Sequence, residues 1–238
     1  MLFRSEIPTI DTECLLLRPD RVGEFPGVVF LTDIWGIRPS NIGMARRLAE
    51  KGFAVLMPNV FHRYSRITPA GWKPQTEAEV HKALGVLFGT LTAEQMVSDG
   101  AAYTDFLLAQ VGVRPGKIGV VGYCFTGQMA DRKAAAEPDL VTAAASFHGG
   151  FLVTDQPDSP HKQDPSVKAP LYFGHAVEDR GPLGAELVGL SGGGIAKAPH
   201  PSCFGGFSPE RGVLDDGAFR RRNFIASARS KQWSSATS

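Results

Sequence analysis

Short apolar runs alternate with helically spaced apolar positions along much of this chain. The run at residues 26–31, PGVVFL, lies between Pro-Gly and Thr-Asp, which predicts a buried strand. Residues 42–51 carry apolar side chains at helical spacing, and a second apolar run follows at residues 53–58. A strand, a helix and a strand in so short a span are typical of a βαβ unit, whose parallel strands are buried on both faces.

Two residues mark the expected ends of this first helix. Ser40 precedes the helical positions and has a hydroxyl that can accept a hydrogen bond from a free backbone N–H, so we expect it to be the N-cap. Gly52 follows the last helical position and is suited to the left-handed C′ residue.

The same alternation continues toward the carboxyl end. It predicts helices at residues 75–91, 93–110 and 128–137, and strands at residues 117–122, 141–147 and 169–175. The fold class expected is α/β, with a mostly parallel central sheet, helices on both faces, and one domain over residues 1–238. Residues 181–206 contain eight glycines and the tail is basic and then Ser-rich, so the C-terminal part is expected to be incomplete.

Composition and charge narrow the function classes. The 238 residues are 43% hydrophobic and 21% charged, with a formal net charge of +1, which is typical of a globular chain. This balance argues against nucleic acid or a membrane surface as a partner. No apolar run approaches the ~18 residues of a membrane helix, and the start lacks the apolar core of a secretory signal, so a cytoplasmic location is expected.

The three cysteines, Cys14, Cys124 and Cys203, are widely spaced and form no C-x-x-C pair. Neither a zinc cluster nor a disulfide framework is therefore indicated. The remaining question is which of them is a reactive thiol.

Cys124 has the sequence context of a nucleophile. In Gly122-Tyr-Cys-Phe-Thr-Gly127 a predicted strand leads in and a predicted helix leads out, as in the strained turn called a nucleophile elbow. A helix N-terminus favours a thiolate, and the amide of Phe125 would point into the same space and donate to an oxyanion. The alternative is that Cys124 is an ordinary buried cysteine.

At these residues the sequence resembles the dienelactone hydrolase family of α/β-hydrolases. The resemblance extends over residues 6–180 and rests on PGVVFLTDIWGIRPSNIGMARRLAEKGFAVLMPNVFHR, KIGVVGYCFTGQMA, SFHGG with SPH following, and LYFGHAVEDR. It implies hydrolysis of lactone or ester bonds by a Cys-His-Asp triad, with no cofactor and no metal. The implied partner is a small-molecule ester or lactone, and the oligomeric state stays open.

Matched position by position, the resemblance implies Cys124 as nucleophile and Asp179 as the acid of the triad. It implies that the amides of Ile34 and Phe125 form the oxyanion hole, and that Asp33 interacts with the resting thiol. Arg63 stands near the place where the family has an arginine that binds an anionic substrate.

Each of these residues also has a simpler interpretation. Asp179 follows a strand at the carboxyl edge of the sheet, where sites form, but it is equally an acid of a surface loop. Asp33 is also a candidate turn cap, and Arg63 a solvated side chain. Trp35 is expected to wall the pocket, which is compatible with core packing.

The expected triad histidine is missing from its motif. The family has a His-Gly-Phe-like motif about thirty residues after the Asp, whereas this chain has Gly205-Gly206-Phe207 there. His200, between two prolines, is the one histidine downstream of Asp179 and is the candidate base. His175 ends a strand at a position outside the triad, and His161 fits a structural role. His148 follows the end of another strand and is either a pocket-lining residue or a packing residue.

Three rival functions are suggested by these departures. The first is a catalytically impaired or non-catalytic protein of the same fold, because Gly205 stands where the triad histidine is expected. One hypothesis for this departure is that a deletion or a shifted reading frame replaced the native segment at residues 181–206. The others are an oxidoreductase, which the lack of G-x-G-x-x-G after the first strand disfavours, and a redox-sensing thiol protein, for which no resolving cysteine is nearby in sequence.

Overall fold

The computed structural model describes residues 1–64, 85–86, 89 and 91–174. Asp179, His175, His200, Cys203 and most of the helix expected at 75–91 lie outside these residues. The helices are α1 (Pro39–Glu50), α3 (Ala93–Leu108), α4 (Gly127–Ala136) and the 3₁₀ turns η1 (Cys124–Thr126) and η2 (Pro160–Ser166). The strands are β1 (Leu2–Ile7), β2 (Thr12–Leu17), β3 (Phe25–Leu31), β4 (Ala54–Pro58), β5 (Val113–Tyr123), β6 (Val141–Phe147) and β7 (Leu171–Gly174).

The described strands form one seven-stranded sheet in the order β1-β2-β4-β3-β5-β6-β7. From β4 to β7 every neighbouring pair is parallel, whereas β1 pairs antiparallel with β2 and β2 antiparallel with β4. The mostly parallel sheet expected from the sequence is therefore confirmed. The antiparallel hairpin at its edge was not predicted.

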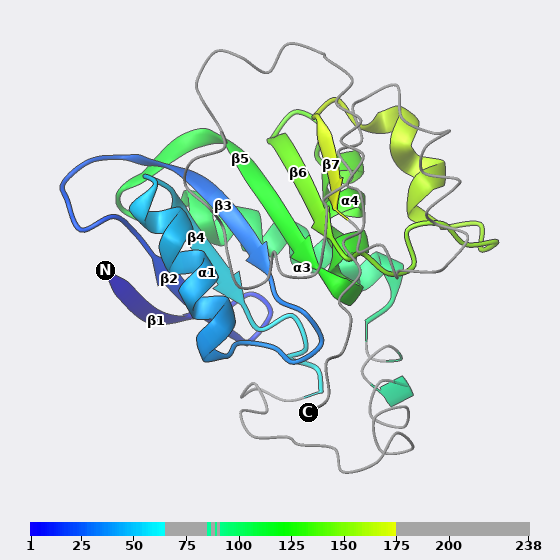
Figure 1. Ribbon diagram of the computed structural model, residues 1–238, viewed down its shortest axis with the longest axis horizontal. Helices are drawn as coiled ribbons and strands as arrows, with labels where there is room; N and C mark the ends of the chain where they lie inside the picture. The colour runs from blue at the N-terminus through cyan, green and yellow to red at the C-terminus, as the bar shows by residue number, and fades with distance from the viewer. Residues whose placement is uncertain (65–84, 87–88, 90, 175–238) are drawn as a thin grey trace, which may run out of the picture.

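Helices cover both faces of the sheet, as the continuous apolar strands indicated. Figure 1 shows α1 on one face and α3 with α4 on the other. Neighbouring residues of β3 alternate between the two layers: Val29 and Leu31 belong to the core under α3 and α4, while Phe30 belongs to the core under α1. All three side chains are buried, which explains why the strand has no polar face.

The ends of α1 show one correct and one wrong expectation. Gly52 lies just past the helix with a φ of +101°, in the left-handed region that favours glycine, and its N–H donates to the Ala49 carbonyl at 2.9 Å. Ser40 is not the N-cap. The N-cap is Arg38, two residues earlier, and the helix begins at Pro39, because proline is pre-organised for the first helical position and needs no partner for an N–H.

The carboxyl ends of β3, β4, β5 and β6 lie at the same edge of the sheet, because these strands are parallel neighbours. Directly after β3, β4 and β5 lie the expected site residues that the structure describes: Asp33, Ile34, Trp35, Arg63, Cys124 and Phe125. None of the described helices is long and apolar enough to cross a membrane.

Candidate active site

Cys124 lies at the junction of β5 and α4 in a strained conformation. Its φ is +55°, in the left-handed region that few residues other than glycine adopt. One 3₁₀ turn, η1, then leads into α4. Such strain persists where the surrounding structure enforces it and is concentrated at functional sites. The side chain is half-buried.

The two glycines of the motif are required by close backbone approach. A Cβ on Gly122 would overlap the Thr126 carbonyl group, with its carbon only 2.7 Å away. A Cβ on Gly127 would lie 2.7 Å from the Gly149 Cα and would also overlap the Ser146 hydroxyl. The turn can therefore be this tight only because both positions lack a side chain.

Three neighbouring segments hold the turn in place. The Gly150 N–H, from the loop after β6, donates to the Cys124 carbonyl at 3.2 Å. The Phe125 ring lies 6.2 Å from the Phe61 ring, in the loop after β4, and 5.9 Å from the Phe151 ring, both between ring centroids. Packing against the loops that follow β4 and β6 thus restricts Phe125, the residue after Cys124.

The Thr126 hydroxyl provides the third connection, to β3. It accepts a hydrogen bond from the Tyr123 N–H at 3.0 Å and lies within donating distance of the Leu31 carbonyl at 3.1 Å and the Tyr123 carbonyl at 3.0 Å. Thr126 is fully buried. The sequence alone did not identify this residue, whose one signal was a hydroxyl side chain between Phe125 and Gly127 at the start of a predicted helix.

Asp33 and its neighbours form a tight turn after β3. The Asp33 carboxylate accepts a hydrogen bond from the Trp35 N–H at 3.0 Å and forms an ion pair with Arg38, while its carbonyl accepts from the Gly36 N–H at 2.9 Å. The polar contacts of Asp33 are thus those of a turn cap, the alternative interpretation of this residue. Contact of Asp33 with the thiol stays a prediction.

Ile34, inside this turn, is half-buried and packs against the same core cluster as Cys124. Among the hydrogen bonds of the described residues, none uses the Ile34 N–H. Trp35 is half-buried beside it, which fits a wall of the site as well as core packing.

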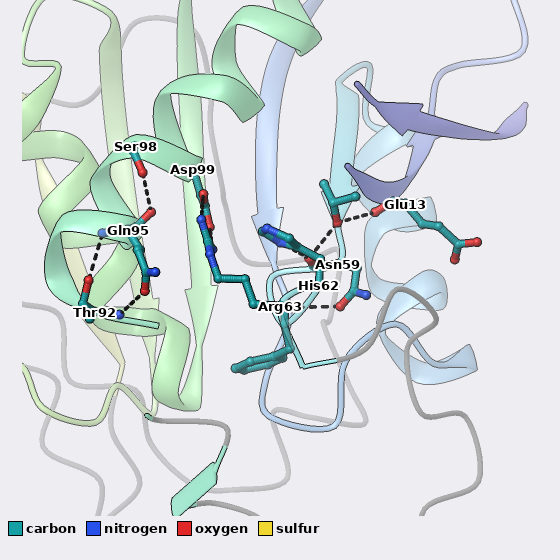
Figure 2. A network of polar contacts seen from close by, with 10 residues as sticks. Glu13, Asn59, His62, Arg63, Thr92, Gln95, Ser98 and Asp99 are labelled. Carbon is teal, nitrogen blue, oxygen red and sulfur yellow. Dashed lines mark hydrogen bonds and ion pairs between the residues drawn. The ribbon is translucent and has the colours of Figure 1, made fainter. Parts of the chain in front are cut away.

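Arg63 has a partner that the sequence did not reveal. Figure 2 shows its side chain extending from the loop after β4 to Asp99 on α3. The guanidinium donates to both carboxylate oxygens, and the bond from Nη2 to Oδ1 measures 2.8 Å. The Asp99 side chain is fully buried and that of Arg63 is 30% exposed. The guanidinium therefore compensates the negative charge of a buried carboxylate. Arg63 is therefore an ion-paired side chain that stays partly exposed, and its contact with substrate stays a prediction.

The Asp99 carboxylate also affects Tyr103, a buried residue of the core. The Tyr103 hydroxyl is fully buried, and burial together with the Asp99 carboxylate raises its pKa well above the ordinary value. Asp99 lies three residues after Met96 and four before Tyr103, on the inward stripe of α3. An acid at an inward helical position was the signal that this residue had a specific partner.

The two described thiols differ in their surroundings. Cys14 in β2 is buried, and burial with the nearby carboxylates of Glu13 and Glu6 raises the pKa of its thiol to about 12. A thiol with so high a pKa is a poor nucleophile at neutral pH. Cys124 is the more accessible of the two and lies at the loop edge of the sheet.

Metal-ligating groups do not gather among the residues that the structure describes: no three His, Cys, Asp or Glu side chains there are placed to hold one ion.

Comparison with known proteins identifies the family. The sequence pattern of the dienelactone hydrolase family matches residues 12–187, a range that includes Cys124 and Asp179. A carboxymethylenebutenolidase of Rhodococcus opacus is 30% identical over 142 residues, which cover 59% of this chain and 50% of the relative. A Synechocystis protein provisionally given the same name is 24% identical over 167 residues, 69% of this chain and 65% of the relative.

The chain thus spans about half to two thirds of the length of these relatives. Among solved structures, a Klebsiella pneumoniae protein provisionally named dienelactone hydrolase superposes with a TM-score of 0.72 at 18% identity, over 86% of this chain and 88% of that one. The dienelactone hydrolase of Anabaena variabilis gives 0.61 at 20% identity, over 86% and 90%. These structural likenesses support the α/β-hydrolase fold, and the match over residues 12–187 shows that the chain belongs to the dienelactone hydrolase family.

Proposed function

We propose that this protein hydrolyses a lactone or carboxylic ester with Cys124 as its nucleophile. The observation that carries the proposal is the left-handed conformation of Cys124, at +55° in φ, in a turn whose glycines admit no side chain. A left-handed residue at a strand-to-helix junction has the geometry of a nucleophile elbow, and such strain is concentrated at functional sites.

In the proposed reaction the Cys124 thiolate attacks the carbonyl carbon of the substrate, and the carbonyl oxygen becomes an oxyanion. The amides of Ile34 and Phe125 donate hydrogen bonds to that oxygen. The tetrahedral intermediate collapses to a thioester as the alkoxide leaves and takes a proton from an imidazolium. Water, deprotonated by the imidazole, then attacks the thioester, which releases the acid and restores the Cys124 thiolate beside the imidazolium.

The remaining triad members are proposed from the resemblance. Asp179 is the acid that would orient the imidazole, and it falls inside the matched residues 12–187. His200 is the candidate imidazole. Both lie outside the described residues.

Arg63 is proposed as the contact for an anionic group of the substrate. Its bidentate bond with Asp99 engages two of the five guanidinium N–H groups, and its side chain is partly exposed. Arg63→Lys keeps a positive charge near Asp99 but loses the planar fork. We expect this variant to raise KM for a carboxylate-bearing ester and to leave KM for a neutral ester within about twofold.

The test of the proposed reaction is hydrolysis of p-nitrophenyl acetate by the wild type and by Cys124→Ala. Turnover by the wild type should fall at least about a thousandfold in the variant, since the covalent step is lost. Cys14→Ala is the matched control and should retain turnover, because Cys14 is buried in β2 with a raised pKa. Equal rates for the wild type and Cys124→Ala would exclude the proposal.

A second candidate is a non-catalytic or impaired protein of the same fold. It is favoured by Gly205, which stands where the family resemblance leads us to expect the triad histidine. This candidate predicts no ester turnover by the wild type. If the wild type is active, His200→Ala tests whether His200 is the base.

A further inference from the structure

We infer that Thr126 is a positioning residue that sets the separation of the two amides of the oxyanion hole. The inference rests on the function proposed above and adds to it a residue for which neither the sequence nor the family resemblance indicated a role.

The Thr126 hydroxyl lies where the pairing of β3 with β5 ends. The last parallel pair of these strands is Leu31 opposite Gly122. One residue beyond that pair, the Tyr123 N–H donates to the Thr126 hydroxyl, which in turn lies 3.1 Å from the Leu31 carbonyl. The side chain therefore continues the connection between the two strands at the point where the backbone ladder stops.

A hydroxyl has the hydrogen-bonding capacity for this position. It has one proton to donate and two lone pairs to accept, so one group can serve an N–H and a carbonyl at the same time. Thr126 is fully buried, and its three partners are backbone groups. The single hydroxyl proton is shared between the Leu31 and Tyr123 carbonyls, and its donation to the Leu31 carbonyl connects β3 with β5.

The two donor amides lie a short distance along the chain from the residues that Thr126 anchors. Ile34 comes three residues after Leu31, and Phe125 comes two residues after Tyr123. Beyond the anchor on the β3 side, the turn at Asp33 restricts Ile34 through two hydrogen bonds, from the Trp35 N–H to the Asp33 carboxylate and from the Gly36 N–H to the Asp33 carbonyl. The distance between the two donor amides is thus determined by one shared point, the Thr126 hydroxyl, and by two short, hydrogen-bonded turns.

Loss of the Thr126 hydroxyl should slow hydrolysis without slowing alkylation of the Cys124 thiol. It leaves the Tyr123 N–H and the Leu31 carbonyl unpaired, so β3 and β5 move apart at their carboxyl ends. A displacement of the order of 1 Å is enough to cost up to about a hundredfold in rate. Alkylation of the thiol develops no negative charge on a carbonyl oxygen, so it does not use the oxyanion hole.

The experiment compares Thr126→Val, which keeps the shape and removes the hydroxyl, with Thr126→Ser, which keeps the hydroxyl. We measure kcat/KM for p-nitrophenyl acetate and the rate of Cys124 alkylation by iodoacetamide, with peptide mapping to separate the cysteines. Thr126→Val should lower kcat/KM by about 10- to 100-fold and change alkylation by less than about threefold. Thr126→Ser should stay within about threefold of the wild type in both.

Thr126→Ala is the second variant if Thr126→Val does not fold, because a water in the vacated space can satisfy the two backbone groups. Parallel losses of hydrolysis and alkylation would mean a purely structural role and would overturn the inference. Unchanged kcat/KM in a folded Thr126→Val would overturn it while leaving the proposed function intact. Absence of turnover by the wild type would overturn both.

Discussion

Two neighbouring parts of the sheet edge are built by different means. The elbow, residues 122–127, is a local structure: its glycines, its strained cysteine and its threonine lie within six consecutive residues. The Arg63–Asp99 pair joins residues that are 36 positions apart, one in a loop and one in a helix. The elbow can turn tightly because its glycines lack side-chain atoms. The Arg63–Asp99 pair is stable because the guanidinium compensates the charge of a buried carboxylate.

Gly122→Ala is expected to have the largest effect on this comparison. The new Cβ would overlap the backbone of Thr126, which cannot move without unwinding the start of α4. We expect a loss of more than about 4 kcal/mol in the free energy of unfolding, measured with urea. Gly119→Ala in the same strand is the control, because its Cβ would meet Val28 at an ordinary 3.6 Å. A stable Gly122→Ala protein would mean that the turn is not closed by backbone contact.

Arg63→Met is expected to come next. It leaves the Asp99 carboxylate buried without a partner, which should cost about 3–5 kcal/mol of stability. Adding Asp99→Asn to this variant should restore part of the loss, because the unpaired charge is removed. The control is Lys168→Met, which breaks the exposed pair between Lys168 and Asp139 and should cause little measurable change. Equal effects of the two substitutions would show that burial does not strengthen the Arg63–Asp99 pair.

The thiol of Cys14 provides a smaller, pH-dependent effect. Its pKa is about 12 in the folded protein and 9.0 ordinarily, so above pH 9 the unfolded chain releases a proton that the folded chain retains. This contribution to stability is complete below pH 9 and is lost as the pH rises toward 12. In Cys14→Ala the fall in unfolding free energy between pH 9 and 11 should be shallower by up to about 1.4 kcal/mol per pH unit. Identical slopes for the two proteins would contradict a raised pKa.

Thr92→Ala should have the smallest effect. Thr92 and Gln95 form a capping box at the start of α3, the helix that carries Asp99, with hydrogen bonds of 2.8 and 3.2 Å (Figure 2). Loss of the cap should cost about 1 kcal/mol in thermal or urea unfolding. Ser98→Ala on the same helix removes an exposed hydrogen bond to the Gln95 carbonyl and is expected to be nearly neutral. A neutral Thr92→Ala would mean that packing alone holds the start of α3.

The strands from β3 to β7 and the helices α1, α3 and α4 could be predicted because their apolar periodicity is strong. Strand 141–147 was predicted at its observed bounds, and the others within a few residues. The hairpin of β1 and β2 escaped prediction: β1 is exposed along five of its six residues, so its sequence lacks the apolar run by which buried strands are recognised.

Some residues of the candidate site could likewise be recognised in the sequence, and others could not. The positions of Cys124, Phe125 and Ile34 directly after strands could be predicted from the sequence, while their roles stay predictions. Thr126 and Asp99 could not be assigned their contacts, because a polar residue in a buried position does not reveal in the sequence which distant group satisfies it. Their partners, the Leu31 carbonyl and Arg63, lie 95 and 36 residues away along the chain.

The sequence by itself therefore determined the α/β order of elements, the glycine-bounded turn around Cys124 and the family. These depend on local sterics and on burial patterns that are written in consecutive residues. Only the tertiary structure decided that Arg63 pairs with Asp99, that Asp33 caps its own turn, and that the Thr126 hydroxyl joins β3 to β5. The physical reason is that a buried polar group must find a partner, and the identity of that partner depends on which segments the fold brings together.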